Sequence, residues 1–445
     1  MRPLLIFLVL GQTTAHAWAQ NPAPVKTAAE AQRLARPDDP ALVQRITSYL
    51  TPFTTRELSG TLLVARGDRI LLERAFGLAN VEQRAPFTPT TPTNVASITK
   101  PLTIIIASRL VEAGKLNVND TVSRWLPEYV HGKRMTVTQL MNHRAGVPHR
   151  LLPEDQQTEP RSATDMVRAA NAVQLLFEPG AQSTYSSGGY AILAAVLERA
   201  SGKSYDELLQ EHVAKPVGAG TIRHVSQRDI LPGRASSFLP AGDVVLNAPL
   251  RDLSFLVGGG SVYTTPRDIY KVMMGLVKGV YGDAARTALL RPNGLRWNGV
   301  TNGFRAFADF NGADSVTVIF FGNAHTGAID LLRREIPRLA AGENVAAATV
   351  PTISAVALTD AARARLAGQY DTGGGSLATV TFVSPKLALF GDRPLAALDD
   401  STFFSFADYA RVTFVSRANG QVDAIEWGAG TWGTGEKGPR FARAR

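Results

Sequence analysis

The chain has 445 residues, 45% of them hydrophobic, a composition typical of a globular protein with room for one large domain and a smaller one. It contains no cysteine, which excludes disulfides, thiol catalysis and cysteine-based metal sites. The net charge of +9 comes from basic residues scattered among acidic ones, so no basic run indicates a nucleic-acid partner. The seven histidines form no close ligand cluster, and we expect neither a metal nor a cofactor.

The first nineteen residues have the pattern of a secretory signal peptide. Arg2 supplies a positive charge, Leu4 to Leu10 form a short apolar run, and Ala17-Trp18-Ala19 is a small-x-small cleavage signal before Gln20. An N-terminal membrane anchor is the alternative, although the apolar run is short for a membrane span. We therefore predict an exported protein, periplasmic or secreted, with no integral membrane segment after signal removal.

Both strands and helices are predicted in the first two thirds of the chain. Residues 20–40, rich in Ala, Pro and Gln, are expected to be a flexible lead-in. Apolar runs on both sides of Gly67 predict a hairpin over residues 58–72. An apolar face behind Ser97 predicts a helix that stops near Gly114. Further helices are expected over 137–141, 166–176 and 190–200.

The next segment returns to strands. Thr265-Pro266 predicts the start of a helix, because threonine caps well and proline suits the first helical position. Apolar runs around Asn311-Gly312 predict a second hairpin, and a helix is expected over residues 328–339. This order of strands, helices and strands indicates an α+β fold, with an antiparallel sheet beside a helical region.

The last quarter of the chain is predicted to be a separate small all-β domain over residues 357–445, joined by a linker over 341–356. Short β-branched and aromatic runs recur there between turn signals, at residues 379–383, 386–390, 412–415 and 424–427.

Ser97 and Lys100 are the first candidates for chemistry. On a helix, residues three apart share a face, so the two side chains can meet. A helix N-terminus offers free N–H groups to an oxyanion, and its positive end disfavours a second positive charge, which suits a lysine acting as a base. The pattern alone is weak, because a helix cap followed by a surface lysine looks the same.

Six short segments, which include Ser97 and Lys100, occur along the chain in the order found in a known family. They are Gly-Thr-Leu-Leu-Val (60–64), Ser-Ile-Thr-Lys (97–100), Leu-Met-Asn-His-Arg-Ala-Gly-Val-Pro (140–148), Tyr-Ser-Ser-Gly-Gly-Tyr (185–190), Gly-Gly-Gly-Ser (258–261) and Gly-Val-Thr-Asn-Gly-Phe (299–304). In these segments the chain resembles the class C β-lactamase-like serine hydrolases, which include penicillin-binding carboxypeptidases, D-aminopeptidases and family VIII carboxylesterases. Residues 41–340 would form that hydrolase domain, and the β domain resembles the lipocalin-like barrels appended to some members.

The resemblance implies a role for each matched residue. Ser97 would be the nucleophile that accepts the acyl group, Lys100 its proton acceptor, and Tyr185 a partner in the acid–base work. The backbone N–H groups of Ser97 and Val300 would form the oxyanion hole. His143 is expected to fix a loop. Simple packing of Tyr185 over a turn is the alternative for that residue.

Two departures from the family pattern concern the substrate. The triplet Trp297-Asn298-Gly299 stands where penicillin-recognising members have a lysine or histidine that holds a carboxylate, and an indole carries no such charge. Ser187 stands where the second box usually ends in asparagine. These four residues are the candidate substrate-binding residues.

Both departures favour an ester over a peptide or a β-lactam. Alternatively Trp297 only packs, and an arginine binds the carboxylate instead; the candidates are Arg144, Arg296 and Arg305.

The sequence therefore predicts an exported serine hydrolase that acts on a small-molecule ester or peptide, with a carboxylesterase preferred. A D-Ala-D-Ala carboxypeptidase or other D-amino-acid peptidase, or a weak β-lactamase, is the alternative within the same chemistry. A catalytically silent protein that binds envelope material is the alternative from another class. The oligomeric state and the role of the β domain stay open.

Overall fold

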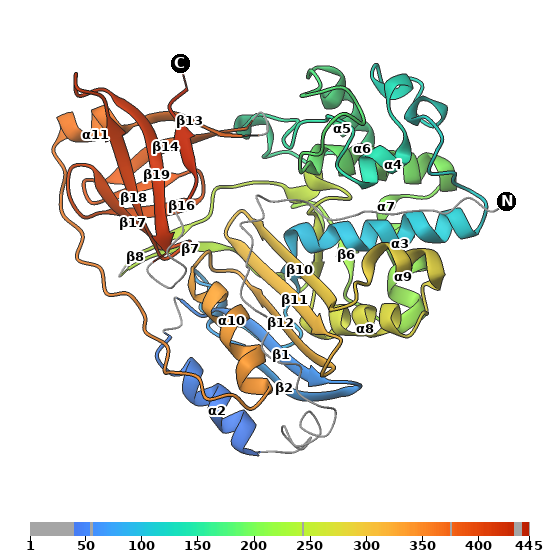
Figure 1. Ribbon diagram of the computed structural model, residues 1–445, viewed down its shortest axis with the longest axis horizontal. Coiled ribbons are helices and arrows are strands. Elements are labelled where there is room, and N and C mark those ends of the chain that lie inside the picture. The colour runs from blue at the N-terminus through green and yellow to red at the C-terminus, as the bar shows by residue number, and fades with distance from the viewer. Residues whose placement is uncertain (1–39, 54–56, 243, 374–375, 431–437, 445) are drawn as a thin grey trace.

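The computed structural model describes residues 40–53, 57–242, 244–373, 376–430 and 438–444. The predicted signal peptide and almost all of the lead-in lie outside these residues. Figure 1 shows three parts: a central sheet with helices, a helical region, and a C-terminal β barrel. Among the described residues, no helix combines the length and apolarity that a membrane crossing requires.

The central sheet has five antiparallel strands in the order β10-β11-β12-β1-β2. Their bounds are Gly294–Thr301, Phe304–Asn311, Val316–Gly322, Gly60–Arg66 and Arg69–Phe76. The predicted first hairpin is thus β1–β2, with Gly67 in its turn at φ +53°. The second predicted hairpin is β11–β12. The strand β10 forms one edge of the sheet, and this edge matters for the site described below.

Each face of the sheet is buried by a different set of helices. Because side chains alternate along a strand, Leu62 and Val64 of β1 join one core, and Leu63 and Ala65 join the other. The first core includes helices α2 (Pro40–Leu50) and α10 (Ala328–Ala340), which lie together on one face of the sheet (Figure 1). The second core includes α8 (Pro266–Val277) and the helical region.

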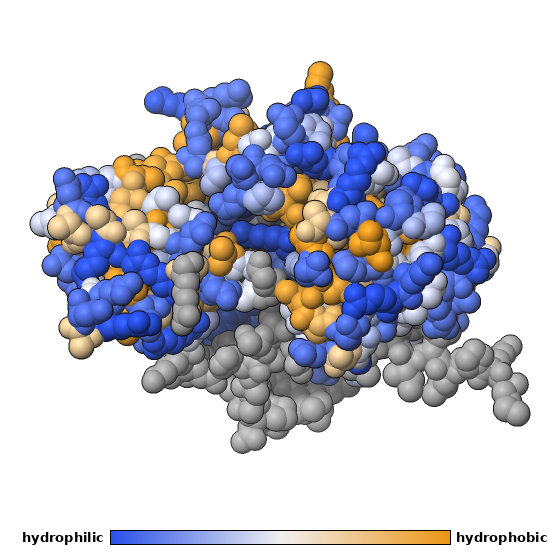
Figure 2. Space-filling model, turned by 90° about the horizontal axis from the view of Figure 1, so that it is seen from above, coloured by the Kyte–Doolittle hydropathy of each residue, from blue (hydrophilic) through white to orange (hydrophobic). Residues whose placement is uncertain are grey.

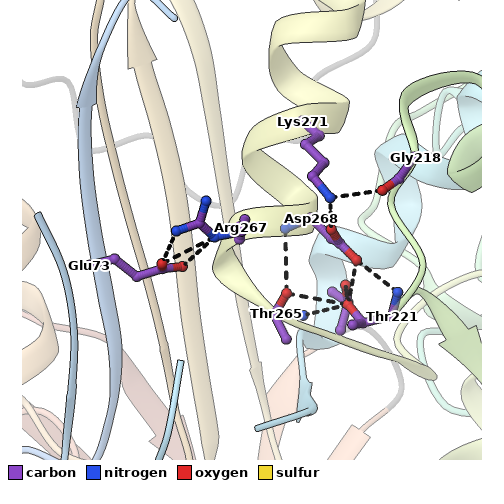
Figure 3. A network of polar contacts seen from close by, with 8 residues as sticks. Glu73, Gly218, Thr221, Thr265, Arg267, Asp268 and Lys271 are labelled. Carbon is purple, nitrogen blue, oxygen red and sulfur yellow. Dashed lines mark hydrogen bonds and ion pairs between the residues drawn. The ribbon is translucent and has the colours of Figure 1, made fainter. Parts of the chain in front are cut away.

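Helix α8 is anchored at its first turn by a set of polar contacts (Figure 3). The Thr265 hydroxyl accepts from the backbone N–H of Asp268, as the capping prediction requires. The buried carboxylate of Asp268 accepts two hydrogen bonds of 2.7 Å from Thr221 and pairs with Lys271 at 2.8 Å. Arg267 pairs with Glu73 of β2 and so ties the helix to the sheet. These contacts fix the helix on its face of the sheet.

The helical region surrounds α3 (Thr99–Glu112), of which ten residues are buried. Its other helices are α4 (Val137–Met141), α5 (Ala163–Asn171), α6 (Ser187–Ser201), α7 (Tyr205–Leu209) and α9 (Gly282–Leu289). The prediction of a helix over 166–176 is wrong at its end. Helix α5 stops at Asn171 because that side chain bonds the Val130 N–H (2.9 Å) and the Glu128 carbonyl (3.0 Å) of a neighbouring loop.

Short strands complete this part of the molecule. They are β3 (Leu78–Asn80) with β4 (Ala85–Pro86), β5 (Thr93–Asn94) and β6 (Arg223–His224) on either side of β9 (Val262–Thr264), and β7 (Phe238–Ala241) with β8 (Val244–Asn247). Strand β5 lies immediately before the turn that carries Ser97, and its pairing with β9 supports that turn.

The C-terminal part is an eight-stranded antiparallel sheet in sequence order, preceded by α11 (Asp360–Leu366). Its strands are β13 (Gly368–Gly373), β14 (Ser376–Ser384), β15 (Leu387–Phe390), β16 (Arg393–Ala397), β17 (Thr402–Ser405), β18 (Ala410–Ser416), β19 (Val422–Gly430) and β20 (Arg440–Ala442). A bridge between Tyr370 and Arg443 brings the two ends together, so the sheet is a nearly closed barrel.

The barrel is fastened to the rest of the chain by specific contacts. Arg305 of β11 donates to the Ala407 carbonyl at 2.7 Å, and the Gly327 N–H donates to the Phe406 carbonyl at 2.9 Å. Figure 2 shows the face of the molecule that includes the barrel and the helical region. This face is mostly hydrophilic, and its hydrophobic residues lie in separate groups. The α+β fold and the small all-β part predicted from the sequence are confirmed by this architecture.

Candidate active site

Ser97 lies on a tight turn that the backbone holds under strain. It belongs to a 3₁₀ turn over Ala96–Ile98, between β5 and α3. Ala96 has φ +46°, a left-handed conformation that costs energy for any residue with a Cβ. The buried side chain of Asn94 stabilises this turn by accepting from the Ala96 N–H at 2.8 Å. The serine is therefore presented by a fixed piece of backbone.

Lys100 lies in the first turn of α3, and its ammonium group is buried beside Ser97. Its Nζ donates to Ser97 Oγ at 3.2 Å, to Ser187 Oγ at 3.0 Å and to the Gly259 carbonyl at 2.8 Å. A lysine has three N–H donors, so these contacts use all of them. The alternative of a helix cap followed by a surface lysine is wrong, since only 5% of Lys100 is exposed.

Tyr185 completes the contacts around the serine. Its hydroxyl donates to Ser97 Oγ at 2.6 Å, and Lys100 Nζ lies 4.6 Å from the centre of its ring. Ser97 Oγ is thus held between a phenol and an amine, the two groups that the sequence assigned to the acid–base work. Both are within the reach expected of a general base and its nucleophile.

Two buried histidines position the segment that carries Tyr185. Nδ1 of His143 accepts from the Ser186 N–H at 3.1 Å, and Nδ1 of His149 accepts from the Ser187 N–H at 3.3 Å. Burial, together with the positive charge of Lys100, lowers the pKa of each imidazole to about 3. Both rings are therefore neutral near pH 7, as their acceptor role requires. His143 fixes the loop as predicted, whereas His149 was not singled out from the sequence.

The edge strand β10 packs directly against the Ser97 turn at Gly299. A Cβ added at Gly299 would lie 2.2 Å from the Val95 carbonyl oxygen and 2.8 Å from the Ser97 nitrogen, so only glycine fits here. Because β10 is an edge strand, the N–H groups on its outer side have no strand partner. Val300 follows immediately, and its N–H and that of Ser97 are the two candidate oxyanion donors.

Two cavities meet at Ser97. The first, of about 320 Å³, lies between α3, α9 and β10. Its lining is mostly apolar and aromatic, from Pro101, Ile104, Tyr190, Leu289 and Trp297, and it also includes Arg291, Asn293 and Arg296. Trp297 is buried in this wall, and Asn298 lines both cavities.

The second cavity, of about 350 Å³, lies on the other side of Ser97 and is more polar than the first. Ser187, Gly299 and Val300 line it, as do Arg150 and Arg251. Gly391 and Asp392, in the turn between β15 and β16, and Arg393, the first residue of β16, also line it. The C-terminal barrel therefore supplies part of the wall beside the candidate nucleophile, which the sequence had left open.

The three arginines proposed as substitutes for the missing cation have different positions. Arg144 donates to the Gly180 carbonyl, and Arg305 is used between the Ala407 carbonyl and Asp330. Arg296 borders the first cavity with a largely exposed side chain. Sequence reasoning missed Arg150, Arg251 and Arg393, which lie outside the six motif segments, in loops or in the barrel.

Within the described part of the chain, no cluster of histidine and acidic side chains could hold a metal ion. The structure brings the predicted site residues together around the two cavities that meet at Ser97. The candidates for catalysis and the oxyanion hole are Ser97, Lys100, Tyr185 and Val300. The candidates for substrate binding are Ser187, Trp297, Asn298 and Gly299.

Comparisons with known proteins agree with this geometry. The model of the Beta-lactamase family matches residues 42–339. The putative penicillin-binding protein PbpX of Bacillus subtilis is 25% identical over 300 residues, covering 64% of this chain and 75% of that protein. Penicillin-binding protein 4* of the same organism is 27% identical over 48% of this chain, and the match spans 51% of its own length.

Two solved structures have the same fold. The D-amino acid amidase of Ochrobactrum anthropi, complexed with L-phenylalanine amide, has a TM-score of 0.56 and 20% identity, covering 64% of this chain and 92% of its own. SurE has a TM-score of 0.56 and 20% identity, and covers 94% of this chain and 99% of its own. The similarity to SurE thus extends beyond the hydrolase fold into the C-terminal part.

Proposed function

From the premise that this chain belongs to the beta-lactamase family of serine hydrolases, we propose that it is an exported carboxylesterase that forms an acyl-enzyme on Ser97. The observation that carries the proposal is the contact of Ser97 Oγ with two groups able to move its proton, Lys100 Nζ at 3.2 Å and the Tyr185 hydroxyl at 2.6 Å. A protein that only binds envelope material has no need of this arrangement.

The proposed reaction has two steps. Lys100 first loses the proton that it shares with Ser97 Oγ, so that its nitrogen lone pair faces that oxygen. Ser97 Oγ then bonds to the carbonyl carbon of the ester while Lys100 accepts its proton. As the bond from this carbon to the alcohol oxygen breaks, Tyr185 donates its hydroxyl proton to the departing alcohol and is reprotonated by Lys100. The N–H groups of Ser97 and Val300 stabilise the oxyanion in this step. A water molecule then adds to the acyl carbon and gives a proton to the Lys100–Tyr185 pair; the bond between this carbon and Ser97 Oγ breaks, the carboxylic acid leaves, and Ser97 Oγ recovers its proton from the pair. The close approach of β10 at Gly299 keeps the two N–H donors near one another.

The preference for esters rests on the first cavity. Trp297 is part of an apolar wall and provides no cation where penicillin-recognising relatives have one. Ser187, in the place of an asparagine, accepts a hydrogen bond from Lys100 Nζ at 3.0 Å and has no side-chain amide to bond a peptide. An apolar acyl or alcohol group fits these surroundings.

A D-amino-acid peptidase or amidase is the second candidate. It is favoured by the relatives, which are named as penicillin-binding proteins, and by the amidase that shares the fold. A nitrophenyl butyrate, a chromogenic cephalosporin and a D-Ala-D-Ala peptide, compared by kcat/KM, decide between the two. Efficient turnover of the peptide or the cephalosporin with little ester hydrolysis would contradict the esterase proposal.

A fluorophosphonate probe separates the enzyme from a silent binding protein. We expect the probe to label the wild type and not Ser97→Ala. Equal labelling of both, or of neither, would contradict the catalytic proposal. Export is tested separately by N-terminal sequencing of the protein from the host's periplasm and medium, where Gln20 is the expected first residue.

A further inference from the structure

The second cavity beside Ser97 carries an unusual concentration of charge. Its lining includes three arginines, Arg150, Arg251 and Arg393, and two acids, Glu154 and Asp392. The arginines come from three separate places: a loop after α4, a loop before β9, and the first residue of β16 in the barrel. Charged side chains on a protein surface usually need no explanation beyond solubility, but three arginines that line one cavity beside a candidate nucleophile suggest a binding role.

Arg150 and Arg251 share one carboxylate oxygen. Nη1 of Arg150 lies 3.3 Å from Glu154 Oε1, and Nη2 of Arg251 lies 2.9 Å from the same atom. Each guanidinium has five N–H donors, and no further side-chain acceptor is found for either group among the described residues. Most of their donor capacity is therefore unused, although the Arg251 side chain is only 10% exposed.

The other acids of this region have partners of their own. Asp392 Oδ2 lies 3.5 Å from the buried His325, and Asp408 pairs with Arg393 at 3.3 Å while it accepts from Ser405 and Trp427. Glu154 contacts both guanidinium groups and Asp392 acts on both from a longer distance, so three arginines face two acids in the lining of this cavity. Consistent with this imbalance, burial and the adjacent Arg251 lower the pKa of Arg150. An anion between the two arginines would relieve their repulsion.

We propose that Arg150 and Arg251, with Arg393 beside them, form a subsite that binds a carboxylate of the substrate. Guanidinium groups bind carboxylates through paired, charge-assisted hydrogen bonds. Arg251, whose side chain is 10% exposed, would supply the buried contact, and Arg150, at 38% exposed, lies nearer to the solvent. The inference rests on the proposed function, because the subsite opens onto Ser97. It makes the substrate an acyl compound with an apolar group on one side of the scissile bond and a carboxylate on the other.

Two matched pairs of thioesters test the subsite and show on which side the carboxylate lies. The first pair is hexanoyl thioglycolic acid and its methyl ester, with the charge on the leaving group. The second pair is the monobenzyl thioester of glutaric acid and its methyl ester, with the charge on the acyl group. Because the chain has no cysteine, the released thiol is measured with Ellman's reagent without interference from the protein.

In one of the two pairs, we expect the wild type to prefer the free acid over the methyl ester by about 10-fold or more in kcat/KM. Arg150→Gln and Arg251→Gln should reduce this ratio towards one, and Glu154→Gln should raise it. Arg199→Gln removes a surface pair with Glu128 and serves as the control for substitution itself.

Failure of the subsite and failure of the proposed function give different results. Ratios near one in both pairs, or a ratio that Arg251→Gln and Arg150→Gln do not change, would overturn the subsite while hydrolysis continues. Hydrolysis no faster than that of Ser97→Ala would contradict the proposed function instead. Calorimetric binding of each acid and methyl ester to Ser97→Ala tests the subsite even then, with tighter binding of the acid expected and equal binding overturning it.

Discussion

Gly299→Ala tests the close approach between β10 and the nucleophile turn. The added Cβ would lie 2.2 Å from the Val95 carbonyl oxygen, whereas ordinary contacts begin near 3.4 Å, so the strand or the turn must move by about 1.2 Å. The turn resists because Asn94 and the strained Ala96 hold it. The strand therefore moves away, and the N–H groups of Ser97 and Val300 separate.

The expected loss follows from the role of these donors. Misplacement of a catalytic group by 1 Å costs about 100-fold in rate, and loss of one oxyanion donor costs about 100- to 1,000-fold. We expect kcat for nitrophenyl butyrate to fall by at least about 100-fold, and overpacking to reduce the free energy of unfolding by about 1–3 kcal/mol.

Gly312→Ala is the matched control, since it lies between β11 and β12 and its Cβ would meet nothing closer than 3.5 Å. We expect this variant to keep wild-type kcat within about twofold and to label normally with the fluorophosphonate. If Gly299→Ala also kept kcat within about threefold of the wild type, the packing of β10 against Ser97 would not be what positions the oxyanion donors.

Three further predictions concern the tyrosine, the histidines and α8. Tyr185→Phe keeps the ring over Lys100 but removes the hydroxyl, so kcat should fall by about 100-fold or more with unchanged thermal stability; wild-type kcat would show that Lys100 suffices. The pKa values of His143 and His149 are about 3 in the folded protein against 6.5 in unfolded chains, so stability should be lost as the pH falls from 6.5 towards 3, by up to about 1.4 kcal/mol per pH unit for each residue. His143→Asn keeps an acceptor and tolerates the φ of +57°, so its unfolding in urea should depend less steeply on pH, and an unchanged slope would contradict this assignment. Asp268→Ala removes the buried carboxylate that holds Thr221 and Lys271 (Figure 3), which should cost about 3 kcal/mol in urea unfolding with little change in KM; a loss below about 1 kcal/mol would mean that other contacts fix α8.

The residues that share local motifs could be predicted from the sequence. Ser97 and Lys100 are three apart on a helix start, and the hairpins around Gly67 and Asn311 have turn residues that determine their geometry. In the barrel, the four predicted runs lie in β14, β15, β18 and β19. Four other strands were not predicted, because runs such as Arg393–Ala397 are short, contain proline, or lack an alternating pattern.

The residues brought together by tertiary structure could not be predicted in this way. Arg150, Arg251 and Arg393 are separated by more than a hundred residues along the chain, and no local pattern distinguishes them from other surface arginines. The end of α5 at Asn171 depends on hydrogen bonds to a distant loop. His149 could have been noticed, since it lies six residues after His143 and immediately after the end of the motif segment 140–148.

The most direct test of the central claim is detection of the acyl-enzyme itself. Wild-type protein is incubated with nitrophenyl butyrate, quenched in acid and analysed by intact and peptide mass spectrometry. We predict a butyryl adduct on the peptide that contains Ser97, absent from Ser97→Ala and much slower to form in Tyr185→Phe. An adduct on another residue, or ester hydrolysis that persists at the wild-type rate in Ser97→Ala, would contradict the claim that Ser97 is the nucleophile.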